Sequence, residues 1–159
     1  MKWGNKPAML LASFILSPAF AQQELPMCAF LDRLVLAAEQ DFKDLRGPFD
    51  FNRARYAGTL TTQGYTTCFT SIYEGTKTYS CERRLPDDAS AARAEWVRAS
   101  QEADQCYSGR SNLVLRNDRS LRFKTKPHGA DVRVHYQRLE RSTSATYLLR
   151  VQVSAHDPE

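Results

Sequence analysis

The 159-residue chain is poor in the motifs by which many enzymes are recognised. It has three histidines, none of them four residues from another, and it has no phosphate-binding glycine loop and no Gly-x-Ser-x-Gly segment. Its four cysteines form neither a Cys-x-x-Cys motif nor close pairs at the spacing of zinc ligands. We therefore expect no catalytic residue, no cofactor and no metal, and we predict that the protein is not an enzyme.

The sequence also has no apolar run long enough to cross a membrane. Its apolar segment near the start, residues 9–16, is much shorter than the roughly 20 residues that a spanning helix needs. Two lysines precede this segment and the small-residue pattern Ala19-Phe20-Ala21 follows it, which is the order of a secretory signal. We expect residues 1–21 to be a signal peptide cleaved after Ala21, and residues 22–159 to form one periplasmic or secreted domain without a transmembrane anchor.

Charge of neither sign dominates the chain, whose formal net charge is +4, but the charges are unevenly placed. Residues 22–107 carry a net charge of −3, whereas residues 108–159 carry +5. A partner attracted by charge is therefore expected to meet the C-terminal third.

Four cysteines permit three disulfide pairings. Residues 65–73 and 76–84 are rich in β-branched and aromatic side chains, and Glu74-Gly75 between them is typical of a tight hairpin turn. With this two-residue loop, Cys68 lies opposite Cys81 at a position where cross-strand side chains approach closely. The spacing favours a Cys68–Cys81 bridge and leaves Cys28 to pair with Cys106.

Helical periodicity supports the second bridge. Apolar side chains recur at helical spacing over residues 26–46 and again from Asp87-Asp88 to about residue 108, and each apolar face includes one cysteine. Because Cys28 opens the first helix and Cys106 closes the second, we expect the two helices to run antiparallel. Both bridges are expected to be structural, since the cysteine count is even and the chain carries an export signal.

The remaining segments read as strands. Residues 55–61, 65–73 and 76–84 precede the second helix, and three segments of alternating polar and apolar residues follow it, near residues 121–126, 132–137 and 147–153. The order is α-β-β-β-α-β-β-β. It predicts an α+β fold in which two helices pack on one face of an antiparallel sheet, held by two disulfides.

Several short motifs carry a resemblance. An early cysteine is followed by Phe42-Lys43-Asp44-Leu45-Arg46-Gly47, then by Cys68 and by Tyr79-Ser80-Cys81-Glu82. This series resembles small exported proteobacterial proteins of unassigned function. The order of the elements is similar to that of class I type III secretion chaperones, and this resemblance implies a chaperone-like fold.

Basic side chains alternate with apolar ones on the last three predicted strands. If these strands are neighbours, one sheet face carries Arg122, Lys124, Arg133, His135 and Arg150. Such a face would suit a protein or an anionic component of the envelope, whereas nucleic acid is disfavoured because no aromatic side chains are interleaved for base stacking. The alternative interpretation is a solvated face whose charges prevent edge pairing.

The sequence therefore predicts an exported, non-enzymatic binding protein of the bacterial envelope. It would engage another protein as an inhibitor, an immunity protein or a chaperone-like protein, through the sheet face or the edge of the second β-meander. The alternative is a small periplasmic hydrolase or envelope-modifying enzyme. His128, Asp131 and a serine would be its candidate triad.

Overall fold

The computed structural model describes residues 22–126, 128–141 and 144–155. The expected signal peptide, residues 1–21, lies outside the described residues, and so does His156. None of the helices in the described ranges combines the length and the apolar character that crossing a membrane requires.

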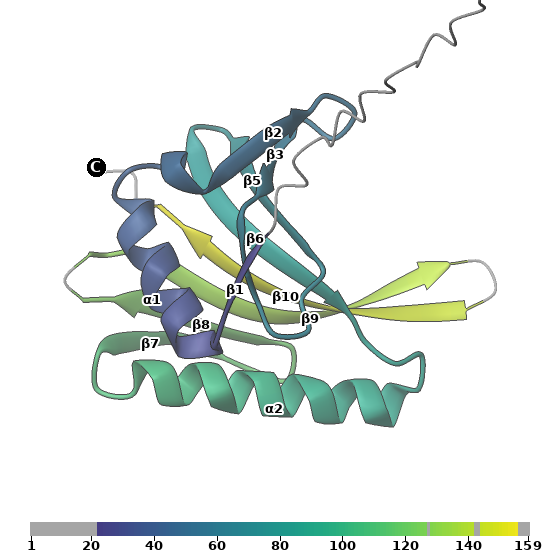
Figure 1. The fold of residues 1–159 in the computed structure, drawn as a ribbon. Helices are drawn as coiled ribbons and strands as arrows, with labels where there is room; N and C mark the ends of the chain where they lie inside the picture. Colours follow the sequence, from purple (N-terminus) through teal and green to yellow (C-terminus); the bar gives the residue numbers. More distant parts are fainter. Residues whose placement is uncertain (1–21, 127, 142–143, 156–159) are drawn as a thin grey trace, which may run out of the picture.

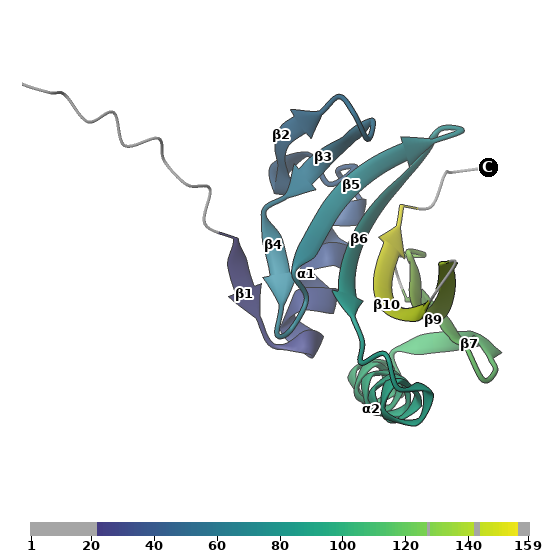
Figure 2. The same ribbon diagram turned by 90° about the vertical axis from the view of Figure 1, so that its right-hand side faces the viewer.

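Two antiparallel meanders join into one large sheet (Figures 1 and 2). The first meander consists of β2 (Arg46–Asp50), β3 (Arg55–Gly58), β5 (Thr67–Tyr73) and β6 (Thr76–Arg84). The second consists of β7 (Ser111–Arg116), β8 (Ser120–Thr125), β9 (Asp131–Arg141) and β10 (Ser144–Ser154). Within the described residues the eight strands follow the order β2-β3-β5-β6-β10-β9-β8-β7, and β1 (Gln23–Leu25) pairs separately, in parallel, with β4 (Leu60–Thr62).

The pairing of β6 with β10 joins the two meanders. It extends from Leu148 opposite Arg84 to Ser154 opposite Thr78, and it places Val151 beside Cys81. Because β10 also pairs along its whole length with β9, the core continues without a break from one meander to the other. The buried side chains on this part of the core face come from three strands: Leu121, Phe123, Val132, Val134, Leu149, Val151 and Val153.

Two helices, α1 (Met27–Ala38) and α2 (Ala89–Tyr107), cover the core. The second helix begins where the sequence predicts it, because the Asp88 carboxylate accepts a hydrogen bond from the Ala91 backbone N–H over 2.7 Å. It buries Trp96 against the sheet, while α1 buries Phe30 and Leu34. The fold is therefore α+β, as predicted.

The first helix is shorter than the periodicity predicts, and its expected extension to residue 46 is wrong. It ends at Ala38, and Asp41 and Phe42 then adopt left-handed backbone angles with φ of 58° and 56°. A single turn of 3-10 helix, Lys43–Leu45, leads directly into β2. Phe42 and Leu45 remain buried, so their helix-like spacing reflects contact with the same core rather than one continuous helix.

Both predicted disulfides are present, Cys28–Cys106 and Cys68–Cys81. The hairpin register places Cys68 directly opposite Cys81, as the two-residue loop predicts. The expected antiparallel helices are wrong: α2 is seen end-on in Figure 2, whereas α1 runs upward in both views. A bridge between the first turn of α1 and the last turn of α2 fixes two helix ends but leaves the axes free to cross steeply. Cys28 itself lies exposed rather than on the buried face.

The predicted order α-β-β-β-α-β-β-β is incomplete. Four strands are additional or divided: β1, β2 and β4 in the first half, and β7 in the second. The strand expected over residues 55–61 is interrupted at Thr59, directly after Gly58 ends β3. A Cβ at Gly58 would lie 2.9 Å from the Cys68 carbonyl carbon, so this close approach requires glycine.

Tyr79 fixes the position of β4 relative to the large sheet. Its hydroxyl donates to the Leu60 carbonyl over 2.7 Å and accepts from the Leu60 N–H over 2.9 Å. Both residues are buried, so one side chain satisfies both polar backbone groups of Leu60 away from water.

The two disulfides are expected to differ in their effect on stability. Cys28 and Cys106 are 78 residues apart in sequence, whereas Cys68 and Cys81 are 13 apart. In the chain-entropy account the double variant C28A/C106A should lower the free energy of unfolding by about 4.5 kcal/mol and C68A/C81A by about 3 kcal/mol. Urea unfolding of both variants measures which bridge contributes more to the free energy of unfolding. A larger loss in C68A/C81A would mean that packing around this buried pair outweighs loop closure.

Candidate functional site

The predicted basic residues do lie on one sheet face, because β8, β9 and β10 are neighbours. We call this surface, which points away from the helices, the polar face. The register places Arg122 opposite Arg133 and His135 opposite Arg150, and Lys124 lies at the end of β8 opposite Asp131. The structure therefore brings all five predicted residues together.

Acidic residues are interleaved with these bases. Arg122 Nε donates to both carboxylate oxygens of Asp131, over 2.8 and 2.6 Å, and Arg150 forms an ion pair with Glu82 on β6. Arg133 and Lys124 form no ion pair with a carboxylate in the described part of the chain. The polar face is thus a ladder of paired charges in which Arg133 and Lys124 retain free positive charge.

His135 carries little of the positive charge expected of this face. Burial between the strands, assisted by the neighbouring charges of Arg150 and Arg133, lowers its pKa to about 4. Its Nε2 atom is buried and has no hydrogen-bond partner among the described residues. The ring is consequently neutral at pH 7.

The outer edge of the sheet, strand β7, carries the most exposed aliphatic run of the structure. Leu113, Val114 and Leu115 are 51%, 51% and 43% exposed. No strand of the described residues pairs with the outer side of β7. The register shifts between Leu113 and Leu115, so Leu113 lies beside Phe123, on the helix side, and Leu115 lies beside Arg122, on the polar face.

Sequence reasoning missed β7. The three aliphatic residues do not alternate with polar ones, and the bulge at Val114 breaks the period of two that revealed the later strands. A usable signal was nevertheless present, because Leu113-Val114-Leu115 is followed by Asn117-Asp118, residue types that favour a turn, and then by the strand with which it pairs.

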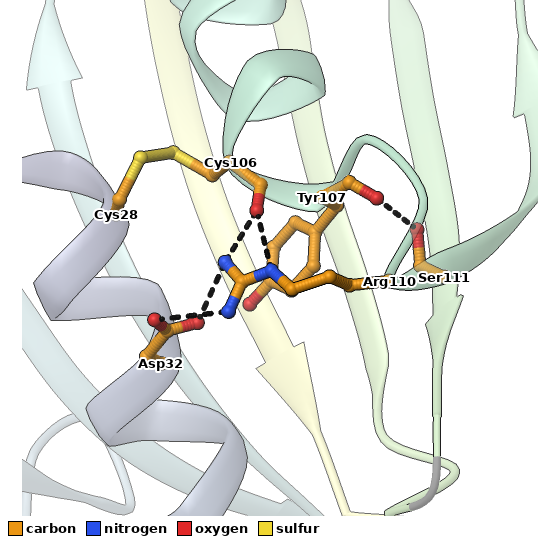
Figure 3. Close-up of polar contacts among 6 residues, drawn as sticks. All are labelled: Cys28, Asp32, Cys106, Tyr107, Arg110 and Ser111. Atoms are coloured by element: carbon orange, nitrogen blue, oxygen red, sulfur yellow. Dashed lines mark hydrogen bonds and ion pairs between the residues drawn. A yellow bond between two sulfur atoms is a disulfide. The ribbon is translucent and has the colours of Figure 1, made fainter.

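A polar clasp ties the end of α2 to α1 (Figure 3). Arg110 Nε donates to the Cys106 carbonyl over 3.0 Å, and the same guanidinium forms an ion pair with Asp32 of α1 at 3.2 Å. Ser111 Oγ donates to the Tyr107 carbonyl over 3.3 Å. Together with the disulfide, these contacts satisfy helix-terminal carbonyls and hold β7 beside the helix end.

A cavity of about 260 Å³ lies next to the clasp. Lys126, His128 and Tyr107 are among the residues that line it. His128 contacts the Glu39 carboxylate through Nδ1, whereas Asp131 is held by Arg122, so the structure does not assemble the triad considered for a hydrolase. Within residues 22–126, 128–141 and 144–155, no three His, Cys, Asp or Glu side chains are grouped to hold a metal ion.

The partial burial of His135 predicts a pH-dependent stability. Because the folded-state pKa of His135, about 4, lies below its ordinary value of 6.5, the folded protein binds fewer protons than the unfolded chain between these values. Stability should therefore fall as the pH is lowered from about 6.5 to about 4, by about 2 kcal/mol after allowing for residual solvent around the ring.

Urea unfolding at pH 7 and at pH 4.5 checks this expectation. His135→Gln should lose less stability between the two pH values than the wild type. Equal losses in the two proteins would assign the pH dependence to other groups.

The chain was also compared with known proteins. No protein-family model, no curated protein and no solved structure matches it.

Proposed function

We propose that this is an exported, non-enzymatic binding protein of the bacterial envelope, and that it engages an extended segment of a partner protein along the free edge of β7. The observation that supports this most directly is the exposure of three consecutive aliphatic side chains, Leu113, Val114 and Leu115, on an edge strand. Inhibitor, immunity and chaperone-like roles are all forms of such binding.

An edge strand offers two kinds of contact to an incoming segment. Its outward backbone N–H and C=O groups can add a strand to the sheet, which supplies affinity without requiring a particular sequence. The side chains of β7 then supply specificity on both faces, since Leu113 lies on the helix side and Leu115 on the polar face. The bulge increases the local twist and favours a short partner segment.

The charge around β7 favours an acidic partner. Lys124 lies opposite Asn112 on the neighbouring strand, and Arg133 lies one strand further in. Both lack an ion pair among the described residues, whereas Arg122 and Arg150 are already paired. Since residues 108–159 carry a net charge of +5, we propose a partner segment with alternating apolar and acidic side chains.

The covalent framework suits an exported role. All four cysteines, each within the described residues, are paired, and such bridges persist in an oxidising compartment. The clasp and the Cys28–Cys106 bridge hold the start of β7 against α2. A pre-ordered edge loses less conformational entropy on binding than a mobile one.

Negative charge on β7 is expected to weaken partner binding. L113E/L115E should weaken capture of the envelope partner by about 100-fold, because two apolar contacts are lost and acidic side chains meet an acidic segment. Ile72→Glu is the matched control, since Ile72 is 49% exposed on β5 of the same sheet and far from the β7 edge in strand order. The measurement is affinity capture from an envelope extract, followed by titration of the identified partner.

The location of the partner-binding site is tested separately from the strength of binding. A photo-crosslinking residue at Val114 should join the partner, and hydrogen exchange of β7 amides should slow when the partner is added. If partner binding survives L113E/L115E but is lost when the charges of Arg122, Arg133 and Arg150 are reversed, the binding site is the polar face and not β7. A concentration-dependent dimer broken by L113E/L115E would identify a second copy of this chain as the occupant.

The contact of His128 with Glu39 beside a cavity is the observation that favours the alternative, a small envelope enzyme. Under the binding proposal, His128→Ala should leave partner binding unchanged. Loss of a hydrolytic turnover in His128→Ala, with an unchanged unfolding midpoint, would favour the enzyme instead.

A further inference from the structure

The turn between β2 and β3 carries Phe51, and no other large apolar side chain of the described residues is more exposed. Phe51 is 87% exposed, and Phe49 on the adjoining strand is partly exposed. The Phe49 ring packs against both Phe51 and Tyr56 in edge-type geometry, with ring centroids 4.9 and 4.8 Å apart. The three rings form one apolar cluster with Phe51 as its outermost member. We call residues 49–56 the aromatic loop.

Asp50 gives the aromatic loop a defined shape. Its carboxylate accepts a hydrogen bond from the Asn52 N–H over 3.0 Å, and its carbonyl accepts one from the Arg53 N–H over 3.3 Å. Ala54 then adopts a left-handed backbone conformation, with φ of 49°, before β3 begins. Because the loop is already ordered, Phe51 can meet a binding partner without a large loss of loop entropy.

Positive charge surrounds the aromatic cluster. Residues 46–56 contain three arginines and one acid, Asp50. Arg53 contacts Asp50 only at 3.8 Å and keeps a side chain that is 66% exposed. The Arg55 guanidinium lies 3.9 Å from the centre of the Phe69 ring and forms no ion pair with a carboxylate of the described residues. Both arginines can therefore reach an anion beside the cluster.

The strand that leads into the aromatic loop is poorly suited to adding a further strand. Pro48 in β2 has no backbone N–H to donate, and the register of β2 with β3 shifts between Arg46 and Phe49. A partner of this part of the molecule is therefore expected to contact the exposed side chains of the loop rather than the backbone of the edge strand.

An apolar tip flanked by arginines matches the chemistry of an anionic lipid surface. Phenylalanine side chains bury themselves at the boundary between headgroups and acyl chains, and arginine pairs with phosphate. Each basic side chain near an anionic leaflet adds to the attraction. We infer that the aromatic loop binds the surface of a membrane that contains anionic phospholipids. Phe51 enters the headgroup boundary, and Arg53 and Arg55 pair with lipid phosphates.

This membrane contact goes beyond the binding of a partner by β7. The strands β2 and β7 are the two ends of the strand order, and Figures 1 and 2 show the β2–β3 turn at the top of the molecule and β7 in its lower half. A molecule held to a membrane by the aromatic loop therefore keeps β7 free for a partner.

Co-sedimentation with vesicles tests the inference, using the oxidised chain of residues 22–159. This range contains every helix, strand and disulfide of the described structure, and it omits the apolar run 9–16, which would itself bind lipid. The probes are vesicles of phosphatidylglycerol and phosphatidylcholine in equal parts and vesicles of phosphatidylcholine alone. The wild type should be half bound at about 0.5 mM accessible anionic lipid and should bind the uncharged vesicles about 10-fold more weakly.

The apolar contact is tested by Phe51→Ser, which removes an exposed ring and leaves the core intact. It should weaken binding to the anionic vesicles by about 20-fold. Leu113→Ser is the matched control, because Leu113 is an exposed apolar residue on the other edge strand of the sheet. This variant should bind the vesicles like the wild type.

The charge contact is tested by Arg53→Gln, with Arg84→Gln as its matched control. Both arginine side chains are 66% exposed, and each contacts an aspartate three residues away in sequence. Arg84, however, ends β6 and leads toward α2, away from the aromatic loop. Arg53→Gln should weaken binding to the anionic vesicles by about 5-fold and leave binding to phosphatidylcholine unchanged, whereas Arg84→Gln should affect neither.

Three results would overturn the inference. The first is absence of wild-type binding to the anionic vesicles, and the second is a loss in Phe51→Ser no larger than that in Leu113→Ser. The third is sedimentation with lipid-free peptidoglycan, or formation of a dimer, that Phe51→Ser abolishes while vesicle binding is unchanged, because the loop would then contact a glycan or a second copy. Titration of a partner on β7 contains no lipid, and Phe51→Ser should leave it unchanged, so the two proposals fail independently.

Discussion

The pairing of β6 with β10 is the contact on which the rest of the structure depends. Without it the chain would be two four-stranded meanders, each with one helix and too little apolar surface to cover. With it, Val151 lies beside Cys81 and the buried valines of β9 and β10 continue into the core around Tyr79. The pairing of β6 with β10 also joins the residues of the sheet that are farthest apart in sequence. The Cys28–Cys106 bridge closes a long loop, which reduces the loss of chain entropy when the two strands pair.

The pairing of β6 with β10 also determines which charges of the polar face are paired. The register places Arg150 opposite Glu82, and the ion pair between them spans 68 residues of sequence. Arg122 is likewise neutralised by Asp131 across β8 and β9. Basic residues that alternate along the sequence are therefore partly neutralised by ion pairs in the fold. His135, which lies among them, is neutral at pH 7 because the charges of Arg150 and Arg133 add to the effect of burial on its pKa.

Local chemistry was sufficient to predict several parts of the fold. The two-residue loop Glu74-Gly75 fixed the hairpin register and with it one disulfide, and Asp88 marked the start of α2. The end of α1 could not be predicted, since Phe42 keeps helical spacing although its backbone is left-handed. The acid partners of the basic residues could not be predicted either, because Glu82 and Arg150 meet only through long-range pairing.

The two edges of the sheet differ in a way that favours β7 as the one open to partners. The other edge, β2, contains Pro48, which has no backbone N–H to donate, and an aromatic cluster of Phe49, Phe51 and Tyr56 packs together there. β7 contains no proline, and its central residues are aliphatic rather than charged. Natural sheets usually protect such an edge with proline, inward-pointing charge or a covering segment. A protein that leaves β7 unprotected in these ways exposes an edge that can either self-associate or bind a partner. The positive charge of Lys124 and Arg133 disfavours self-association, because two copies of this edge would repel each other.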